Sequence, residues 1–179
     1  HPIAASHEVV VVSNSPGDGL GAWLADEHPG VRFVASPSNV GYARAVNAGI
    51  EVAEGREILV INPDVVLEAN SVDRALEYLR AHPQVGLLGV RLCNADGSDQ
   101  HNARRFYTLT TILLRRTPLG KIWPDHSAIR DHLMLDDDLS RARPVDWVTG
   151  AFMLVRREAI ETVGAMDERF FLYFEDVDW

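Results

Sequence analysis

Residues 58–64 read Ile-Leu-Val-Ile-Asn-Pro-Asp, an apolar run that ends in a polar turn. An unbroken run of branched apolar residues is typical of a parallel strand that is covered on both faces. Asn62, Pro63 and Asp64 all favour turns, so the strand should end at this point. The run therefore predicts a buried strand with a carboxylate just past its carboxyl end.

Two strands and two helices are predicted on the amino-terminal side of this run. Residues 9–12 and 31–34 are short, apolar and rich in valine, and the first is followed by a turn-rich loop at 13–19. Residues 22–28 can form a short helix, and residues 42–54 have the small and apolar content of a second one. Strand and helix thus alternate as far as Asp64.

The alternation continues on the carboxyl-terminal side. Asn70 or Ser71 can cap a helix that Pro83 stops, and a further apolar strand follows at 85–90. The order β-α-β-α-β-α-β predicts an α/β fold with a mostly parallel central sheet flanked by helices. Ligands on such sheets bind beyond the carboxyl ends of the strands, where Ser13, Asn14 and Asp64 are expected.

The pattern weakens between residues 94 and 144 and returns with a strand at 151–155 and a helix at 156–163. The last ten residues, 170–179, combine aromatic side chains with Glu175, Asp176 and Asp178. One interpretation is an aromatic core strand with acids at its exposed end. The other is a pair of carboxylates in which burial and like charge raise at least one pKa, as a general base requires.

Composition and charge restrict the function further. The chain has 179 residues and a formal net charge of −9, which argues against a general nucleic-acid binder. No apolar run is long enough to span a bilayer, and a single cysteine excludes an internal disulfide, so a cytoplasmic protein is expected. The basic segment, residues 104–123, holds five Arg and Lys and no acid. It is either an ordinary surface helix or a contact for an anionic membrane face or an acceptor diphosphate.

Four blocks carry a resemblance to a known family. They occur in this order: Asn39-x-Gly41-x-Ala43-x-x-x-Asn47-x-Gly49-Ile50, then Ile61-Asn62-Pro63-Asp64, then Asp146-Trp147-Val148-Thr149-Gly150-Ala151, then Asp167-Glu168-x-Phe170-Phe171-x-Tyr173-x-Glu175-Asp176. Together they resemble the family 2 glycosyltransferases of the GT-A fold, most closely the bacterial rhamnosyltransferase-like members. The resemblance extends from about Val9 to Trp179, and the final block is its most specific part.

The resemblance implies an inverting, metal-dependent transferase. It would move a sugar, rhamnose first, from a nucleotide diphosphate to a saccharide or polyprenyl-linked acceptor in cell-wall or polysaccharide synthesis. Asp64 is the implied ligand of Mn²⁺ or Mg²⁺, since Asn-Pro-Asp alone would be only a turn, and Asp176 is the implied base. The implied substrate-binding residues are Ser13, Asn14, Asn39, Asn47, Asn62, Asp146, Trp147, Gly150 and Glu175. The expected donor is dTDP-rhamnose, followed by UDP-sugars.

The departures from the family pattern set the alternatives. Ser13 stands where the family usually has an aspartate that reads the pyrimidine, and the family's first strand is expected to precede His1. We therefore expect a single GT-A domain over residues 1–179 that is truncated at both ends and can fold yet be inactive. The alternative is a non-catalytic nucleotide-sugar-binding module of the same fold. An unrelated dinucleotide oxidoreductase would need a GxGxxG loop after a strand, and the sequence has none.

Overall fold

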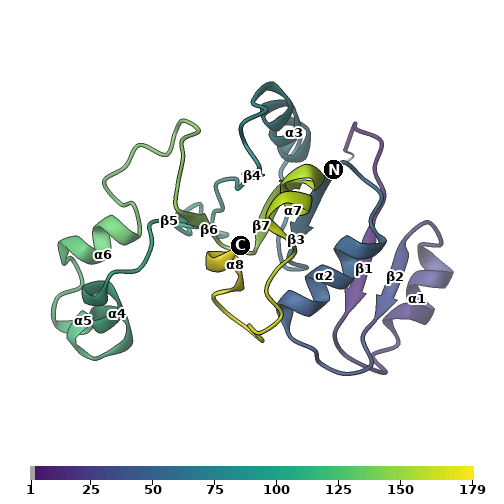
Figure 1. Ribbon diagram of the computed structural model, residues 1–179, viewed down its shortest axis with the longest axis horizontal. Helices are drawn as coiled ribbons and strands as arrows, with labels where there is room; N and C mark the ends of the chain where they lie inside the picture. Colours follow the sequence, from purple (N-terminus) through teal and green to yellow (C-terminus); the bar gives the residue numbers. More distant parts are fainter. Residues whose placement is uncertain (1–2) are drawn as a thin grey trace. The chain divides into compact units, whose positions relative to one another are not determined.

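The computed structural model describes residues 3–179. These residues form two compact units, drawn in Figure 1. Unit 1 comprises residues 3–88 together with Gly150–Trp179, and unit 2 comprises Gly89–Thr149. The expectation of a single domain over residues 1–179 stays a prediction.

The first sheet of unit 1 is a parallel pair. Strand β1 (Val10–Ser13) pairs with β2 (Arg32–Ala35), with Val11 opposite Phe33. Helix α1 (Leu20–Glu27) connects the two strands. A Cβ on Gly21 of this helix would lie 2.5 Å from the Phe33 ring, so a glycine is needed for α1 to approach β2 this closely.

The second sheet of unit 1 has the order β3-β7-β4. Strand β7 (Phe152–Arg156) runs antiparallel to both β3 (Glu57–Ile61) and β4 (Leu87–Leu88). Because β7 is the middle strand, its side chains from Phe152 to Val155 are at most 3% exposed. Burial of a large apolar side chain stabilises a fold by about 1.5–3 kcal/mol, so β7 is a main source of stability in unit 1.

The α/β class predicted from the sequence is confirmed, and the strand pairing adds a detail that the sequence pattern did not give. Strands β3 and β4 share one direction, since both are antiparallel to β7. They are separated, however, by a strand that comes some sixty residues later in the chain, as the bounds of β4 and β7 show. The sheet is therefore less parallel than its β-α-β order predicts.

Four helices complete the part of unit 1 that concerns the site. Helix α2 (Tyr42–Val52) follows Gly41, whose φ of 87° suits glycine, and helix α3 (Ser71–Ala81) buries its apolar side against the unit. Asn70 lies at the predicted cap position of α3, but its side chain makes no capping hydrogen bond. Helix α7 (Arg157–Val163) follows β7, and the short α8 (Glu175–Asp178) carries the acidic pair.

The aromatic stretch before Glu175 does not form a core strand, so that interpretation of residues 170–179 is wrong. Residues 171–174 are 41–69% exposed. Tyr173 and Phe174 have φ values of 69° and 73°, in the left-handed region that side chains other than glycine rarely adopt. The turn that these two residues make leads directly into α8.

Unit 2 has its own small core. Strand β5 (Ala103–Arg104) pairs antiparallel with β6 (Trp147–Val148), and the helices between them are α4 (Leu109–Arg116), α5 (Leu119–Ile122) and α6 (Ser127–His132). The Thr108 hydroxyl caps α4 by accepting a hydrogen bond from the Thr111 amide at 3.1 Å. The most buried side chains of the unit include those of Thr111, His132 and Met134.

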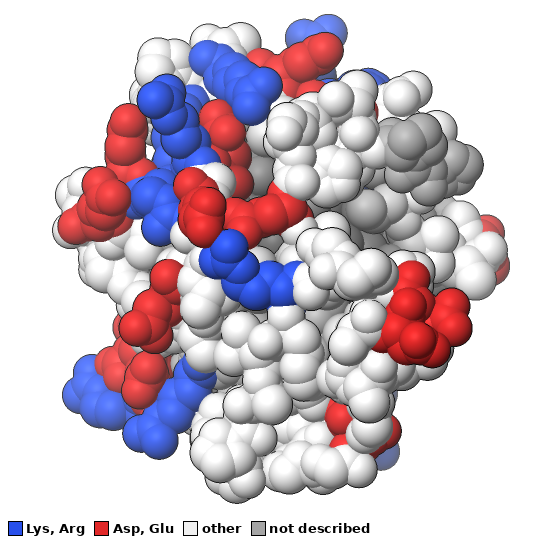
Figure 2. Space-filling view, turned by 90° about the vertical axis from the view of Figure 1, so that its right-hand side faces the viewer, with Lys and Arg blue, Asp and Glu red and all other residues white. Residues whose placement is uncertain are grey.

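The described surface carries charges of both signs. On the side of unit 1 where α1 and β2 lie, Figure 2 shows acidic and basic side chains next to one another. Arg32 of β2, for example, pairs with Glu54 at 2.8 Å and with Glu8 at 3.9 Å. Among residues 3–179, no helix combines the length and the hydrophobicity needed to cross a membrane.

Candidate active site

The loop after β1 brings two of the predicted residues into contact. The Asn14 side-chain amide donates hydrogen bonds to Asn39 Oδ1 at 3.0 Å and to the Gly41 carbonyl at 3.1 Å. Its Oδ1 accepts from the Val40 amide at 2.9 Å. Asn14 and Asn39 thus hold the segment that leads into α2, and their predicted contact with the nucleotide stays a prediction.

The same loop contains an aspartate that the sequence interpretation missed. The buried Ser13 hydroxyl donates to Asp18 Oδ2 at 2.6 Å, and Asp18 Oδ1 accepts from the Leu20 amide at 2.9 Å. These hydrogen bonds, that from Ser13 first, lower the pKa of the exposed Asp18 carboxyl. The Asp18 carboxylate therefore lies beside Ser13, the position at which the family usually has an aspartate. The signal in the sequence was an aspartate five residues later in the same turn-rich loop.

Asn47 of α2 binds another segment of the chain. Its amide donates to the Met166 carbonyl at 2.8 Å, and its Oδ1 accepts from the Met166 amide at 3.0 Å. The side chain thus imitates a strand partner and ties α2 to the segment that precedes Glu175. Its predicted role in substrate binding stays a prediction, because the described contacts of its amide are internal.

The carboxyl end of β3 lies beside the amino end of β7. Ile61 is opposite Phe152, and the Asn62 amide donates to the Ala151 carbonyl at 3.1 Å. The Val65 amide donates to the Asn62 carbonyl at 3.2 Å, which closes the predicted turn. Asp64 is exposed within this turn, so its carboxylate is open to a ligand.

The described residues fit a metal bound through the substrate better than a metal enclosed by protein. Within residues 3–179, no three His, Cys, Asp or Glu side chains are grouped to hold a metal ion. Mg²⁺ and Mn²⁺ in phosphate-transfer sites commonly bind one or two carboxylates and fill the other positions with phosphate oxygens and water. A single exposed carboxylate at Asp64 is compatible with that arrangement.

Asp176 is fixed at the same edge of the sheet. Its Oδ2 accepts a hydrogen bond from the Gly150 amide at 3.2 Å, and its Oδ1 accepts from the Val177 amide at 2.9 Å. Gly150 directly precedes Ala151, the residue that pairs with Asn62. Three of the predicted residues, Asn62, Gly150 and Asp176, are therefore linked through consecutive backbone contacts.

The neighbour of Asp176 has an unusual environment for an acid. Glu175 is 5% exposed, and its Oε2 has no hydrogen-bond partner among the described residues. Burial, together with the nearby charge of Asp176, raises the pKa of Glu175. The raised pKa that the sequence predicts for the acidic pair is thus found at Glu175, the neighbour of the proposed base. Burial, together with Glu175 and Asp176, also raises the pKa of Tyr42. Tyr42 is a residue near the acidic pair that the sequence interpretation missed.

Two predicted residues, Asp146 and Trp147, lie in unit 2. Asp146 Oδ2 accepts from the Phe106 amide at 2.8 Å. The Trp147 indole is 7% exposed, donates from Nε1 to the Arg105 carbonyl at 3.0 Å, and lies below the Arg104 guanidinium at 5.1 Å. Both residues support the fold of unit 2, and their predicted contact with a substrate stays a prediction.

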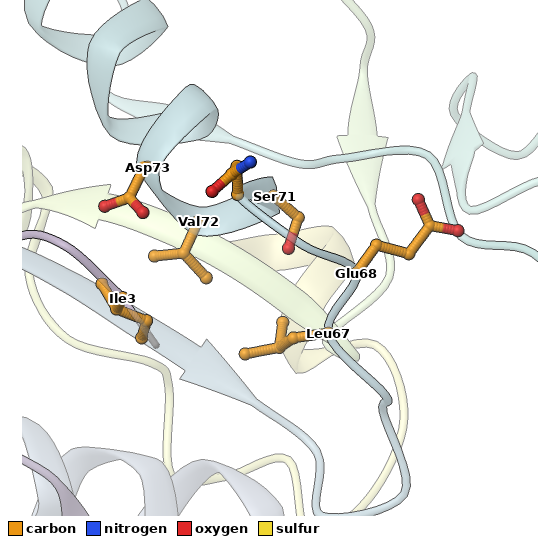
Figure 3. A pocket seen from close by; sticks show the side chains of 7 residues that line it. Ile3, Leu67, Glu68, Ser71, Val72 and Asp73 are labelled. Atoms are coloured by element: carbon orange, nitrogen blue, oxygen red, sulfur yellow. The ribbon is translucent and has the colours of Figure 1, made fainter. Parts of the chain in front are cut away.

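A small hollow at the start of α3 is separate from these residues. Figure 3 shows the side chains around it, and its lining consists of Ile3, Leu67, Glu68, Asn70, Ser71, Val72 and Asp73. Asp73 accepts hydrogen bonds from the backbone amides of Ala4 and Ala5 at 3.1 and 3.3 Å. The hollow thus marks where the amino-terminal segment attaches, and it contains none of the predicted site residues.

Comparison with known proteins identifies a family. The sequence model of glycosyl transferase family 2 matches residues 4–164. An N-acetylglucosaminyl-diphospho-decaprenol L-rhamnosyltransferase of Mycobacterium tuberculosis is 34% identical over 95% of this chain and 58% of its own length. The low-salt glycan biosynthesis hexosyltransferase Agl10 of Haloferax volcanii is 26% identical over 99% of this chain and 53% of its own. The chain thus spans just over half the length of these relatives.

A solved structure has the same fold. The mannosyltransferase PcManGT from Pyrobaculum calidifontis, in complex with GDP-Man and Mn²⁺, matches with a TM-score of 0.54 at 20% sequence identity. The match covers 90% of this chain and 38% of that protein. It confirms the GT-A fold predicted from the sequence blocks.

Proposed function

The chain belongs to glycosyl transferase family 2, and we propose that it takes part in inverting sugar transfer from a nucleotide diphosphate to a saccharide or lipid-linked saccharide. The observation that carries the proposal is the Asp176 carboxylate, which two backbone amides hold at the edge of the sheet. Such a transfer needs a proton acceptor and a site for the diphosphate. In this proposal Asp176 is the proton acceptor, and the turn that contains Asp64 is the site for the diphosphate.

The proposed reaction assigns one step to Asp176. Its carboxylate accepts the proton of the acceptor hydroxyl while the acceptor oxygen forms a bond to the anomeric carbon of the donor sugar. The bond from that carbon to the diphosphate oxygen breaks, and the diphosphate leaves with the bonding electron pair. Attack from the face opposite the leaving group inverts the anomeric configuration. Positioning and general-base catalysis together account for the rate in this scheme.

Asp64 is the proposed ligand for Mn²⁺ or Mg²⁺. When bound, such an ion neutralises charge on the leaving diphosphate. The exposure of Asp64 beyond β3 supports this role. The Mn²⁺ in the PcManGT complex is consistent with divalent metal use in this fold.

For the donor, we propose dTDP-rhamnose first and UDP-sugars second. The order rests on the rhamnosyltransferase that is 34% identical to this chain. Asn14 and Asp18 in the loop after β1, together with Asn39, which binds Asn14, are the proposed nucleotide contacts. The acceptor of the same relative carries a diphospho-decaprenol group, which supports a polyprenyl-linked acceptor and cell-wall or polysaccharide synthesis for this chain.

The basic segment is the proposed contact with the membrane in which such an acceptor resides. Large apolar side chains are exposed along it: Phe106, Leu109, Ile112, Leu113, Leu119, Ile122 and Trp123. Arg115 and Arg116 lie in the last turn of α4, and Lys121 lies in α5. Cations attract the segment to anionic lipid, and the apolar side chains insert, so we propose peripheral attachment at the cytoplasmic face.

Some cations of the basic segment also make contacts within unit 2. Arg105 pairs with Asp131 at 3.4 Å and with Asp137 at 3.3 Å, both beyond the segment. Arg115 donates to His132 Nε2 at 2.6 Å. Because these arginines also support unit 2, the exposed apolar side chains give the cleaner test of membrane contact.

A nucleotide titration tests the proposed donor site. Binding of dTDP and UDP to the wild type is measured by calorimetry with Mn²⁺, with Mg²⁺ and with a chelator. We expect tighter binding with either metal ion, and loss of that enhancement in Asp64→Ala. The matched control is Asp73→Ala, an aspartate at the start of α3 outside the proposed site. Metal-independent binding to the wild type would overturn the role of Asp64.

A sugar-transfer assay distinguishes the alternative function, which the titration alone leaves open. A non-catalytic nucleotide-sugar-binding module would bind the donor with the same metal dependence. It would transfer no sugar to any acceptor, and Asp176→Asn would then leave all measured properties unchanged.

A further inference from the structure

Gly150, the residue that donates to Asp176, is itself fixed by a side chain of α2. The Tyr42 hydroxyl donates a hydrogen bond to the Gly150 carbonyl at 2.7 Å. The Gly150 amide donates to Asp176 Oδ2 at 3.2 Å. Gly150 is therefore held on one side by Tyr42 and holds the carboxylate on the other.

The Tyr42 side chain also packs tightly against the backbone of Gly150. A Cβ added to Gly150 would lie 3.0 Å from the Tyr42 hydroxyl oxygen and 3.3 Å from its ring. Glycine at position 150 thus allows the tyrosine to lie directly against the backbone. A small displacement of the ring would be transmitted to the Gly150 amide, because side chains in a packed interior have little free space.

The backbone of Tyr42 fixes the second segment that leads to Asp176. The Tyr42 amide donates to the Phe171 carbonyl at 2.8 Å. A Cβ on the preceding Gly41 would lie 2.5 Å from the same carbonyl oxygen, so the two segments approach as closely as glycine permits. One residue of α2 therefore contacts both chain segments that position Asp176, the one before β7 and the one before α8.

Tyr42 is a hydrogen-bond donor at neutral pH, since the ordinary pKa of its phenol is 10.0. Burial and the nearby Glu175 and Asp176 raise this pKa further. Its single O–H is committed to the Gly150 carbonyl, which leaves no proton for a reacting group. Tyr42 can orient the site but has no proton to transfer.

We infer that Tyr42 is a positioning residue for Asp176, which it holds through Gly150 and through the segment at Phe171. The inference rests on the proposed function, because it gives Tyr42 a role in the reaction that Asp176 performs. Its physical content is that the hydroxyl of Tyr42 sets the place of the carboxylate relative to the acceptor. A misplacement of about 1 Å can reduce turnover by as much as ~10²-fold.

The variant that isolates this role is Tyr42→Phe, which removes the hydroxyl and keeps the ring. The matched control is Tyr78→Phe in α3, where the ring stacks on His82 at 3.9 Å between centroids. Hydrogen exchange of the Gly150 amide, followed by NMR, measures the hydrogen bond from this amide to Asp176. We expect exchange to be faster by about tenfold in Tyr42→Phe and unchanged in Tyr78→Phe, because loss of the bond from Tyr42 to the Gly150 carbonyl lets Gly150 move away from Asp176.

The kinetic measurement separates positioning from general stability. We expect Tyr42→Phe to lower kcat by about tenfold with the KM for the donor unchanged. The melting temperature should fall by only about 2–4 °C, as the loss of one hydrogen bond implies. A tenfold fall in kcat accompanied by a tenfold rise in the KM for the donor would instead indicate a disturbed donor site. That result would overturn the inference. A kcat and a Gly150 exchange rate equal to those of Tyr78→Phe would also overturn it.

Asp176→Asn distinguishes failure of this inference from failure of the proposed function. If Asp176→Asn is inactive and Tyr42→Phe behaves as wild type, the positioning role is wrong and the base assignment stands. If Asp176→Asn retains wild-type turnover, the base assignment fails, and the role of Tyr42 fails with it.

Discussion

Units 1 and 2 use their polar and apolar side chains differently. In unit 1, Asn14, Asn47 and Asp176 are engaged by backbone groups of distant segments, and the middle strand β7 is buried. In unit 2, the helices α4 and α5 expose apolar side chains beside the arginines at the end of α4. The difference fits the proposal that unit 1 holds groups in fixed positions for chemistry and that unit 2 presents a surface for docking.

The largest expected difference concerns packing. Leu154 of β7 is 1% exposed and Leu109 of α4 is 83% exposed. We expect Leu154→Ala to lower the free energy of unfolding by about 2–5 kcal/mol, because it removes buried contacts and leaves a cavity. Leu109→Ala should change it by about 0.5 kcal/mol or less, as is usual for surface positions. Urea denaturation measures both, and equal losses would break the distinction between core and docking surface.

The second test concerns the docking surface. We expect the wild type to sediment with vesicles of anionic lipid at low salt and to be released at high salt, because the Debye length falls from ~10 Å at 0.1 M to ~3 Å at 1 M. Leu109→Ser with Leu113→Ser should weaken binding at low salt by at least ~10²-fold, since each inserted leucine contributes about 1.5–3 kcal/mol.

The control for this test comes from unit 1. Val66→Ser with Val163→Ser also replaces two apolar side chains, which are 90% and 70% exposed. This pair should leave vesicle binding unchanged. A wild type that ignores anionic vesicles at low salt, or an equal loss in the control pair, would show that the basic segment is an ordinary surface. Capture by an acidic protein without vesicle binding would assign the surface to a protein partner instead.

The third test uses pH, to which the two units should respond in opposite directions. Burial, and then Arg115, lower the pKa of His132 from its ordinary 6.5. The contribution of His132 to the free energy of unfolding is therefore fully present above pH 6.5 and is lost as pH falls through the folded pKa. Burial and Asp176 raise the pKa of Glu175 from 4.5. The contribution of Glu175 to the free energy of unfolding is therefore present below pH 4.5 and is lost as pH rises through the folded pKa.

Difference curves between wild type and variants measure these two contributions. The stability of wild type relative to Glu175→Gln should decline as pH rises above 4.5, and relative to His132→Gln it should decline as pH falls below 6.5. Chemical denaturation between acidic and neutral pH supplies both curves. Parallel curves for wild type and either variant would remove that residue from the comparison.

Local pattern predicted much of unit 1. The strands at 10–13, 32–35, 57–61 and 152–156 lie within one or two residues of the predicted ranges, because runs of branched apolar residues determine them locally. The insertion of β7 between β3 and β4 was not predictable, since it depends on pairing between distant segments. Helix α6 was missed, and the surface helix considered for residues 104–123 is two helices, α4 and α5, which are short and lie among prolines and a glycine.

The candidate site shows the same limit. The sequence indicated Asn14, Asn39, Gly150 and Asp176 as residues of one site, but their mutual contacts appear only in three dimensions. Tyr42 was missed because a tyrosine at the start of an amphipathic helix has no distinguishing local pattern. Its role becomes visible through the Gly150 carbonyl, 108 residues away in the chain.

The most direct test of the account is sugar transfer by Asp176→Asn, measured together with donor affinity. Asparagine keeps the size of the side chain but cannot accept the acceptor's proton. We expect donor affinity to match that of the wild type and turnover to fall by at least ~10²-fold, the usual scale for loss of a general base. Turnover close to that of the wild type, with the donor still bound, would contradict the assignment of Asp176 and with it the proposed mechanism.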